Sequence, residues 1–293
     1  MLLKIKTLIR RFFVKSLQLH RPTNWPYISG DSFRSLAQHI FDESITFEPL
    51  DVQNGDIIFV RTNYLKTFFE SLYPNIKNNF ILISHNEDMC IDTDFLIYAN
   101  EKKIIHWFAE NLLLKHEKIT PIPIGIYSRF GDKKNIVIQS IEKLKDSEKE
   151  LNKIFYNFNI NTNINIRKKI LDILDKLPLA ETTTSRLVQR EYFDISSRYK
   201  FIASPPGNGP DCHRTWEVLY LNSIPIVERS VFTEYFEKLK LPLLVIEKWE
   251  DLEKYTEENL SDMFENIINK SDKKALFMPY WIDLIMKYKN DNN

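Results

Sequence analysis

A glycine-rich turn followed by ionisable side chains lies between two apolar runs of the chain. The string FIASPPGNGPDCHRTWEVLYLNSIPIV covers Phe201 to Val227 and places His213, Arg214 and Glu217 at the start of an expected helix. The first backbone N–H groups of a helix are unpaired and carry about half a positive charge, so they attract anions. A strand, a turn and a helix start in this order therefore predict an anion site, and a phosphate is the anion we expect.

The spacing of these side chains extends the prediction to a nucleotide. Arg214 lies in the first helical turn, where a cation opposes the macrodipole, which indicates a functional role. Glu217 shares a face with His213 and lies where a carboxylate suits a ribose hydroxyl pair. We expect Asp211 to cap the helix, and the glycines of the turn at 207–209 to use positive φ and approach a phosphate closely. The alternative is a capped helix with a surface Arg–Glu pair.

The elements that position these residues follow an α/β pattern. Apolar runs of strand length alternate with helical periodicity, which predicts largely parallel sheets. We expect two Rossmann-like lobes with a cleft between them. The expected strands are 56–62, 79–84, 103–111 and 119–125 in the first half, then 153–160, 200–204 and two later runs. A charged helix after 132 marks the boundary, giving an arm (1–30), an N-lobe (31–148) and a C-lobe with C-terminal helices (149–293).

Composition narrows the class of protein. The 293 residues include 40 Lys and Arg and 40 Asp and Glu, so the net charge is zero. A nucleic-acid-binding protein usually has a basic excess, so we expect no nucleic-acid partner. Two cysteines, Cys90 and Cys212, are too few for a disulfide framework or a thiolate zinc site, and we expect free thiols.

The first twenty residues form a separate feature. Lys and Arg alternate with apolar residues at helical spacing from Met1 to His20, which predicts a basic amphipathic helix. Such a helix either lies on an anionic membrane surface or docks on its own protein. No run is long enough to span a membrane, and basic residues interrupt any signal-peptide core. We therefore expect a cytoplasmic protein, with peripheral attachment to a membrane through residues 1–20 as an option.

The string SPPGNGPDCHRTWEVLYLNSIPIV resembles the C-terminal motif of exostosin-like glycosyltransferases. In the first half, IIHWFAEN followed by ITPIPIGI is similar to an N-lobe segment of bacterial and viral relatives. The resemblance extends in order from Asp56 to Trp249, and only the stretch 204–227 is specific. It implies the two-lobed GT-B architecture and inverting sugar transfer without an essential metal cofactor. It also implies a nucleotide-sugar donor on the C-lobe and a glycan or glycolipid acceptor on the N-lobe.

The same resemblance assigns roles within the donor site. Arg214 corresponds to the diphosphate contact, Glu217 to the ribose contact, and His213 lies near the phosphate or the transferred sugar. The wider GT-B pattern has two glutamates separated by seven residues, and the first is missing here, because Gly209 stands in that region. The resemblance places seven residues at the donor: Gly207, Asn208, Gly209, His213, Arg214, Glu217 and Glu228.

Inverting transfer requires a base that removes the proton of the acceptor hydroxyl. The expected strand 79–84 ends just before His85, Glu87 and Asp88, and we expect Asp88 to be the base, followed by Glu87 or His85. An ordinary polar loop is the alternative. Arg61 and Tyr64, which follow the expected strand 56–62, are predicted to face the acceptor. For Arg61 this means an anionic acceptor or the diphosphate.

Two alternatives to this reading remain open. Asp92 and Asp94 form a D-x-D sequence, which binds the metal in the other large glycosyltransferase architecture and predicts a metal-dependent transferase. A non-catalytic nucleotide- or glycan-binding protein would keep the C-lobe site but lack a working base. His106, among apolar residues, is predicted to be a buried core histidine.

Overall fold

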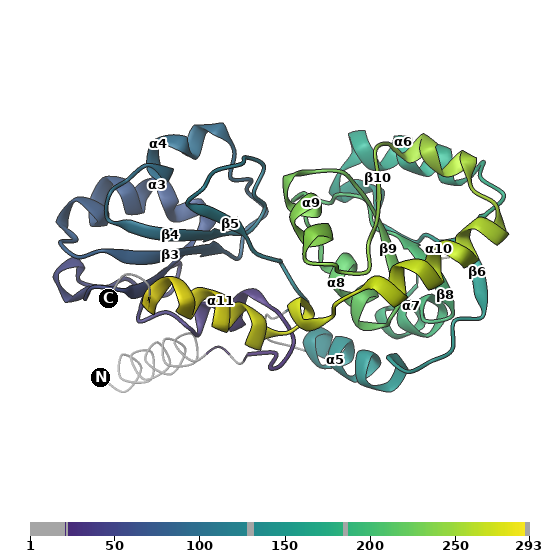
Figure 1. Cartoon of the computed structure of the whole chain (residues 1–293), viewed down its shortest axis with the longest axis horizontal. Helices are drawn as coiled ribbons and strands as arrows, with labels where there is room; N and C mark the ends of the chain where they lie inside the picture. Colours follow the sequence, from purple (N-terminus) through teal and green to yellow (C-terminus); the bar gives the residue numbers. More distant parts are fainter. Residues whose placement is uncertain (1–20, 22, 128–131, 184–186, 291–293) are drawn as a thin grey trace, which may run out of the picture.

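The computed structural model describes residues 21, 23–127, 132–183 and 187–290. The predicted amphipathic helix at 1–20 lies outside these residues. The described chain forms two five-stranded parallel sheets, one in each of two lobes (Figure 1). The predicted α/β class with two Rossmann-like lobes is therefore confirmed. Among the described residues, no helix is both long enough and apolar enough to cross a membrane.

The N-lobe sheet has the strand order β1-β2-β3-β4-β5. Its central strands are continuous apolar runs because both faces of the sheet are covered, as parallel sheets require. All six residues of β3 are buried, including Ser84 and His85 at its carboxyl end. The strands are β1 (His39–Phe41), β2 (Asp56–Arg61), β3 (Phe80–His85), β4 (Ile104–Ala109) and β5 (Ile119–Pro121).

The C-lobe sheet has the order β10-β9-β8-β6-β7. Strand β7 is added on one side of β6, and β8 and the later strands are added on its other side, so the strand order reverses between β6 and β8. Ligands of open parallel sheets bind beyond the carboxyl strand ends near such a reversal. The strands are β6 (Leu151–Phe155), β7 (Ala180–Glu181), β8 (Tyr199–Ala203), β9 (Ile224–Glu228) and β10 (Leu244–Ile246).

Short helical segments cover the N-lobe and longer helices cover the C-lobe. The N-lobe helices are α2 (Gly30–Arg34), α3 (Leu65–Thr67) and α4 (Leu96–Ala99). The following helices are α5 (Asp132–Leu144), α6 (Ile164–Leu174), α7 (Gln189–Ser196), α8 (His213–Tyr220), α9 (Val231–Lys238), α10 (Glu257–Lys270) and α11 (Met278–Asn290). One apolar cluster fills the outer side of each sheet, and a third extends from the N-lobe sheet across α11 to the C-lobe.

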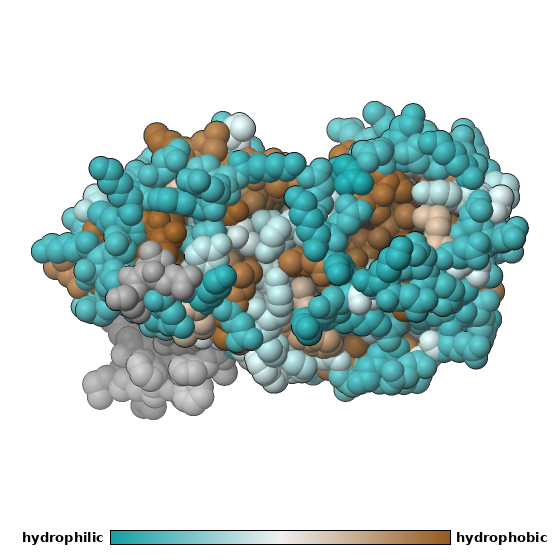
Figure 2. Space-filling view, viewed as in Figure 1, coloured by the Kyte–Doolittle hydropathy of each residue, from teal (hydrophilic) through white to brown (hydrophobic). Residues whose placement is uncertain are grey.

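The chain crosses between the lobes twice. Helix α5 leaves the N-lobe after β5 and packs on α7 of the C-lobe. Helix α11 returns and lies against the N-lobe, as Figure 1 shows. There Tyr288 stacks on His106 with ring centroids 3.8 Å apart, and Trp281 contacts Phe33. The sequence reading assigned all residues after 149 to the C-lobe, so it did not include this return. Figure 2 shows the notch between the lobes on a largely hydrophilic face.

Candidate functional site

The glycine-rich turn is held in place by two side chains at the start of α6. Arg167, on α6, donates from Nε to the carbonyl oxygen of Pro206 at 2.8 Å and from Nη2 to that of Pro205 at 3.0 Å. Asn163 donates from Nδ2 to the carbonyl oxygen of Gly207 at 2.9 Å. The turn conformation is thus fixed by a nearly buried guanidinium that the sequence reading did not single out.

The glycines of the turn are required for close contacts with neighbouring side chains and not for a positive φ angle. Neither Gly207 nor Gly209 has a positive φ, so that expectation is wrong. A Cβ atom at Gly209 would lie 2.8 Å from Nδ2 of Asn111, and one at Gly207 would lie 3.2 Å from Nη2 of Arg167. Asn111 belongs to the N-lobe, so Gly209 permits the two lobes to touch at the turn.

Asp211 does not cap helix α8, because the N-cap residue is Cys212 and makes no side-chain cap. The buried Asp211 carboxylate instead accepts from the backbone N–H of Ile124 at 2.9 Å and from Nε1 of Trp216 at 2.9 Å. Burial raises the pKa of Asp211 to about 7, and the hydrogen bonds from Ile124 and Trp216 oppose this rise. Asp211 therefore joins the segment after β5 to the start of α8.

The Arg214 side chain points into the C-lobe, and only part of its guanidinium is hydrogen-bonded. Its Nη2 donates to the carbonyl oxygen of Asn157 at 2.7 Å, while Nε and Nη1 lack a hydrogen-bond partner among the described residues. Its guanidinium carbon lies 5.1 Å from the ring centroid of Tyr192. Burial acts to lower the pKa of Arg214, but Tyr192 and other neighbours outweigh it and raise the pKa. The side chain stays a cation.

A cavity of about 770 Å³ opens beside these groups. Nearly all of the predicted donor residues line it: Gly207, Asn208, Gly209, His213, Arg214 and Glu217. The other wall of the cavity was not predicted from the sequence. It includes residues 156–162 beyond β6, together with Thr183, Gln189 and Tyr192. The predicted strand 153–160 ran past the true end of β6 at Phe155, and this concealed the carboxyl-end loop where a ligand contact was to be expected.

Two predicted contacts lie elsewhere. Glu228 is exposed at the end of β9, where its carbonyl oxygen accepts from Oγ1 of Thr233. Tyr64 packs edge-on against Phe41 with ring centroids 5.6 Å apart. Neither Glu228 nor Tyr64 lines this cavity or the smaller one beside it.

A smaller cavity of about 200 Å³ lies on the N-lobe side and shares Asp88, Ile124 and His213 with the larger one. His213 donates from Nδ1 to the carbonyl oxygen of Gly125 at 2.8 Å, so the segment after β5 orients its ring. The smaller cavity is otherwise lined by Arg21, Gly30, Asp31, His85, Asn86, Glu87, Glu110 and Tyr127. All three base candidates therefore face one cavity that adjoins the predicted donor site.

The three base candidates have different surroundings. Asp88 accepts from Nδ2 of Asn208 across the cleft at 3.1 Å and borders both cavities. Glu87 forms an ion pair with Arg61, and its Oε1 lies 3.0 Å from Nη2 of that arginine. His85 is 1% exposed and donates from Nε2 to the carbonyl oxygen of Pro123 at 3.0 Å.

His85 is paired with a carboxylate that the sequence reading missed. Oε2 of buried Glu110, just beyond β4, lies 3.0 Å from Nδ1 of His85. Burial acts to lower the pKa of His85, but Glu110, together with the contacts to Pro123 and Asn86, raises the pKa overall. A histidine with both ring nitrogens engaged has no free site for a proton, so its position suits support of the loop at 86–88. Glu110 had a signal in sequence, since it follows a buried strand as Asp88 does.

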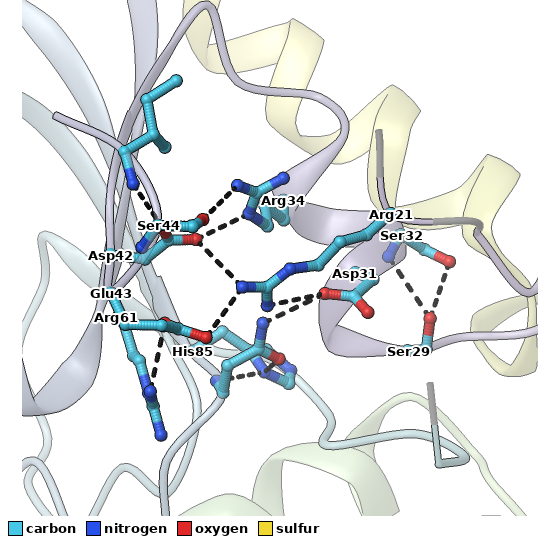
Figure 3. A network of polar contacts seen from close by, with 12 residues as sticks. Arg21, Ser29, Asp31, Ser32, Arg34, Asp42, Glu43, Ser44, Arg61 and His85 are labelled. Atoms are coloured by element: carbon cyan, nitrogen blue, oxygen red, sulfur yellow. Dashed lines mark hydrogen bonds and ion pairs between the residues drawn. The ribbon is translucent and has the colours of Figure 1, made fainter. Parts of the chain in front are cut away.

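Arginines and carboxylates form an ion network beside the smaller cavity (Figure 3). Arg21 lies 2.7 Å from Glu43, 3.5 Å from Asp31 and 3.6 Å from Asp42. Arg61 lies 3.0 Å from Glu43 and, as stated, contacts Glu87. Arg61 lines neither cavity, and both arginines are already neutralised by carboxylates.

The D-x-D sequence lies away from these cavities. Oδ1 of Asp92 accepts from the backbone N–H of Asp94 at 3.1 Å and so caps a short helical turn. Neither residue lines a cavity. His106 is a core residue as predicted: Oγ1 of Thr120 lies 2.8 Å from its Nε2, and burial lowers its pKa to about 4.

Comparison with known proteins gives structural similarity only. No protein-family model and no curated protein matches the chain. Similar solved structures include the spinosyn rhamnosyltransferase SpnG complexed with thymidine diphosphate (10% identity, 80% of this chain and 68% of that chain, TM-score 0.37). Another is a glycosyltransferase from Rickettsia africae (10% identity, 80% of this chain and 76% of that chain, TM-score 0.40). A third is WaaG, a glycosyltransferase involved in lipopolysaccharide biosynthesis (11% identity, 90% of this chain and 80% of that chain, TM-score 0.38). At such low identity and TM-score, the similarity carries no conclusion about the function of this chain.

Proposed function

We propose that the protein is a glycosyltransferase that moves a sugar from a nucleotide-sugar donor to a glycan or glycolipid acceptor. The observation that carries the proposal is the pair of adjoining cavities, one in each lobe, that share Asp88 and His213. A donor in one cavity and an acceptor in the other would meet at these two residues. The exostosin-like motif at 204–227 supports the same reading.

The larger cavity suits a nucleoside diphosphate. Its volume of about 770 Å³ lies within the range of small-molecule sites. Arg214 and the backbone N–H groups at the start of α8 would bind the diphosphate, and buried Glu217 would accept from the ribose hydroxyls. SpnG was solved with thymidine diphosphate, so this nucleotide belongs among those to be tested.

The transfer we propose is a single inverting displacement without an essential metal. The acceptor hydroxyl oxygen bonds to the anomeric carbon as the bond from that carbon to the diphosphate breaks. Asp88 takes the hydroxyl proton, because it borders both cavities and its contact is an amide and not a cation. The diphosphate leaves with the electron pair, and Arg214 and the start of α8 stabilise its charge.

The smaller cavity favours an acceptor without negative charge. Four carboxylates line it, and its one arginine, Arg21, already contacts Asp31, Asp42 and Glu43. An anionic sugar would have to displace one of these carboxylates. We therefore propose an uncharged or amine-bearing acceptor, in place of the anionic acceptor that the sequence reading linked to Arg61.

A further proposal concerns attachment to a membrane. Attachment to an anionic membrane through residues 1–20 would bring the enzyme to a glycolipid acceptor. Flotation with anionic liposomes, comparing the full chain with a chain lacking residues 1–20, tests this attachment. Equal flotation of the two chains would contradict it.

The proposed function is tested by nucleotide release from UDP-, GDP-, CMP- and dTDP-sugars, each with EDTA and with manganese. We expect one nucleotide to be released in EDTA, and Arg214→Ala to abolish the release. Arg198→Ala, which removes a surface arginine paired with Glu150, is the matched control and should retain it. Release only with manganese would favour a metal-dependent transferase. Nucleotide binding without release from any donor and acceptor mixture would favour a binding protein.

A further inference from the structure

Tyr192 is a buried residue of the donor cavity whose hydroxyl has no evident structural purpose. It lies on α7, is 7% exposed and lines the larger cavity. Its ring packs in the central apolar cluster, with the rings of Phe193 and Phe155 at centroid distances of 5.8 and 6.1 Å. Packing therefore explains an aromatic ring at this position, and phenylalanine would supply it equally well.

The hydroxyl of Tyr192 is closed from solvent and has no hydrogen-bond partner among the described residues. Other buried tyrosines of the chain do have partners. Tyr220 donates to the carbonyl oxygen of Leu276 at 2.5 Å and accepts from the N–H of Ile28 at 3.0 Å, and Tyr156 donates to Asp175. An unpaired buried hydroxyl destabilises the folded state, so its presence requires another explanation.

The unpaired hydroxyl lies beside two further unpaired donors. Nε and Nη1 of Arg214 also lack a partner among the described residues, and the guanidinium lies over the Tyr192 ring. The phenol oxygen and the guanidinium lie within hydrogen-bonding range, and their contact raises the pKa of Arg214. The contact is poorly aligned, and a guanidinium can only donate, so the phenol O–H proton still has no acceptor. Burial raises the pKa of Tyr192 to about 12, so the phenol is a donor at neutral pH. Three donors without an acceptor match an anion that has several oxygens.

We propose that Tyr192 is a donor-binding residue whose hydroxyl bonds to a diphosphate oxygen together with Arg214. This inference rests on the proposed nucleotide-sugar site and adds a residue to it. The three donor atoms are closed from solvent in the free protein, so we expect the guanidinium to turn toward the cavity when the diphosphate enters. The free protein therefore carries unpaired donors that become paired only in the complex.

The test is Tyr192→Phe, examined by calorimetric titration and by urea unfolding. The titrants are UDP, GDP, dTDP and inorganic pyrophosphate, and the tightest of them is used for the comparison. We expect affinity to fall about tenfold, because hydrogen bonds to charged groups are among the stronger ones. We expect the urea midpoint of the free variant to be unchanged or higher, because the unpaired hydroxyl is gone.

Tyr220→Phe is the matched control, since it removes a paired buried hydroxyl outside the donor cavity. It should lower the urea midpoint and leave affinity unchanged. Unchanged affinity in Tyr192→Phe, with binding lost in Arg214→Ala, would overturn this inference and leave the proposed function standing. A lower midpoint in Tyr192→Phe would reveal a structural role and also overturn it. If the unmodified protein binds none of the four titrants, this inference fails, and nucleotide release from the donor panel decides the proposed function separately.

Discussion

Asp211 makes the stability of this protein depend on pH in an unusual direction. Its carboxylate is buried where the segment after β5 meets α8, and burial raises its pKa from 3.8 to about 7. The folded state then binds the proton more tightly than the unfolded state. Stability from this group is full below pH 3.8 and is lost as pH rises through 7. Most salt-bridged aspartates act in the opposite direction.

The expected size follows from the two pKa values. Their difference corresponds to about 4 kcal/mol of unfolding free energy, of which roughly 3 kcal/mol is lost between pH 5 and pH 8. Asp211→Asn removes the titration, because an amide resembles the protonated carboxyl and keeps one acceptor oxygen. We expect the variant to match the natural protein only below pH 3.8, where Asp211 is protonated in both the folded and the unfolded state. Its stability advantage over the natural protein should grow by roughly 3 kcal/mol between pH 5 and pH 8.

Urea unfolding at pH 5, 6, 7 and 8 measures this difference. Asp194→Asn, a surface aspartate paired with Lys143, is the matched control and should differ little from the natural protein at every pH. Other titrating groups, such as His85, affect all three proteins alike. A difference between Asp211→Asn and the natural protein that stays constant, or turns against the variant at high pH, would refute the reasoning. The hydrogen bonds from Ile124 and Trp216 would then outweigh burial.

Three further outcomes are expected. Asp88→Asn should reduce turnover at least about 100-fold with nucleotide affinity within twofold, and an unchanged rate would move the base elsewhere. Gly209→Ala should push Asn111 aside and cost about 1–3 kcal/mol in urea unfolding, whereas an unaltered midpoint would show that the contact yields easily. Neutral pyranosides should bind at least about tenfold more tightly than their uronic acids by NMR titration. Glu43→Gln, which removes the nearest of the three carboxylates around Arg21, should narrow that ratio. Tighter binding of uronic acids by the natural protein would contradict the acceptor proposal.

The local pattern of the sequence was sufficient for the two lobes and for most of one wall of the larger cavity. Buried parallel strands are continuous apolar runs, so β2, β3 and β8 were predicted close to their observed bounds. The turn at 207–209 and the start of α8 are local features, because the turn, the helix and their spacing lie within ten residues. The same local reading failed at the end of β6, since an apolar run does not reveal where strand pairing stops.

The tertiary structure decided which side chains are available for chemistry. His85, Glu87 and Asp88 are neighbours in sequence, but their partners are distant from one another. Glu110 follows β4, Arg61 ends β2, and Asn208 belongs to the other lobe. Sequence spacing does not predict such pairs, because they depend on which strand ends meet at the edge of the sheet.

The opposite wall of the larger cavity was decided in the same way. Tyr192 has the pattern of a core helix residue, and only its surroundings reveal an unpaired hydroxyl beside Arg214. The return of α11 to the N-lobe likewise depends on packing across the lobes, with Tyr288 on His106. Local periodicity therefore determined the elements of this protein, and contacts between residues distant in sequence determined the groups that face its cavities.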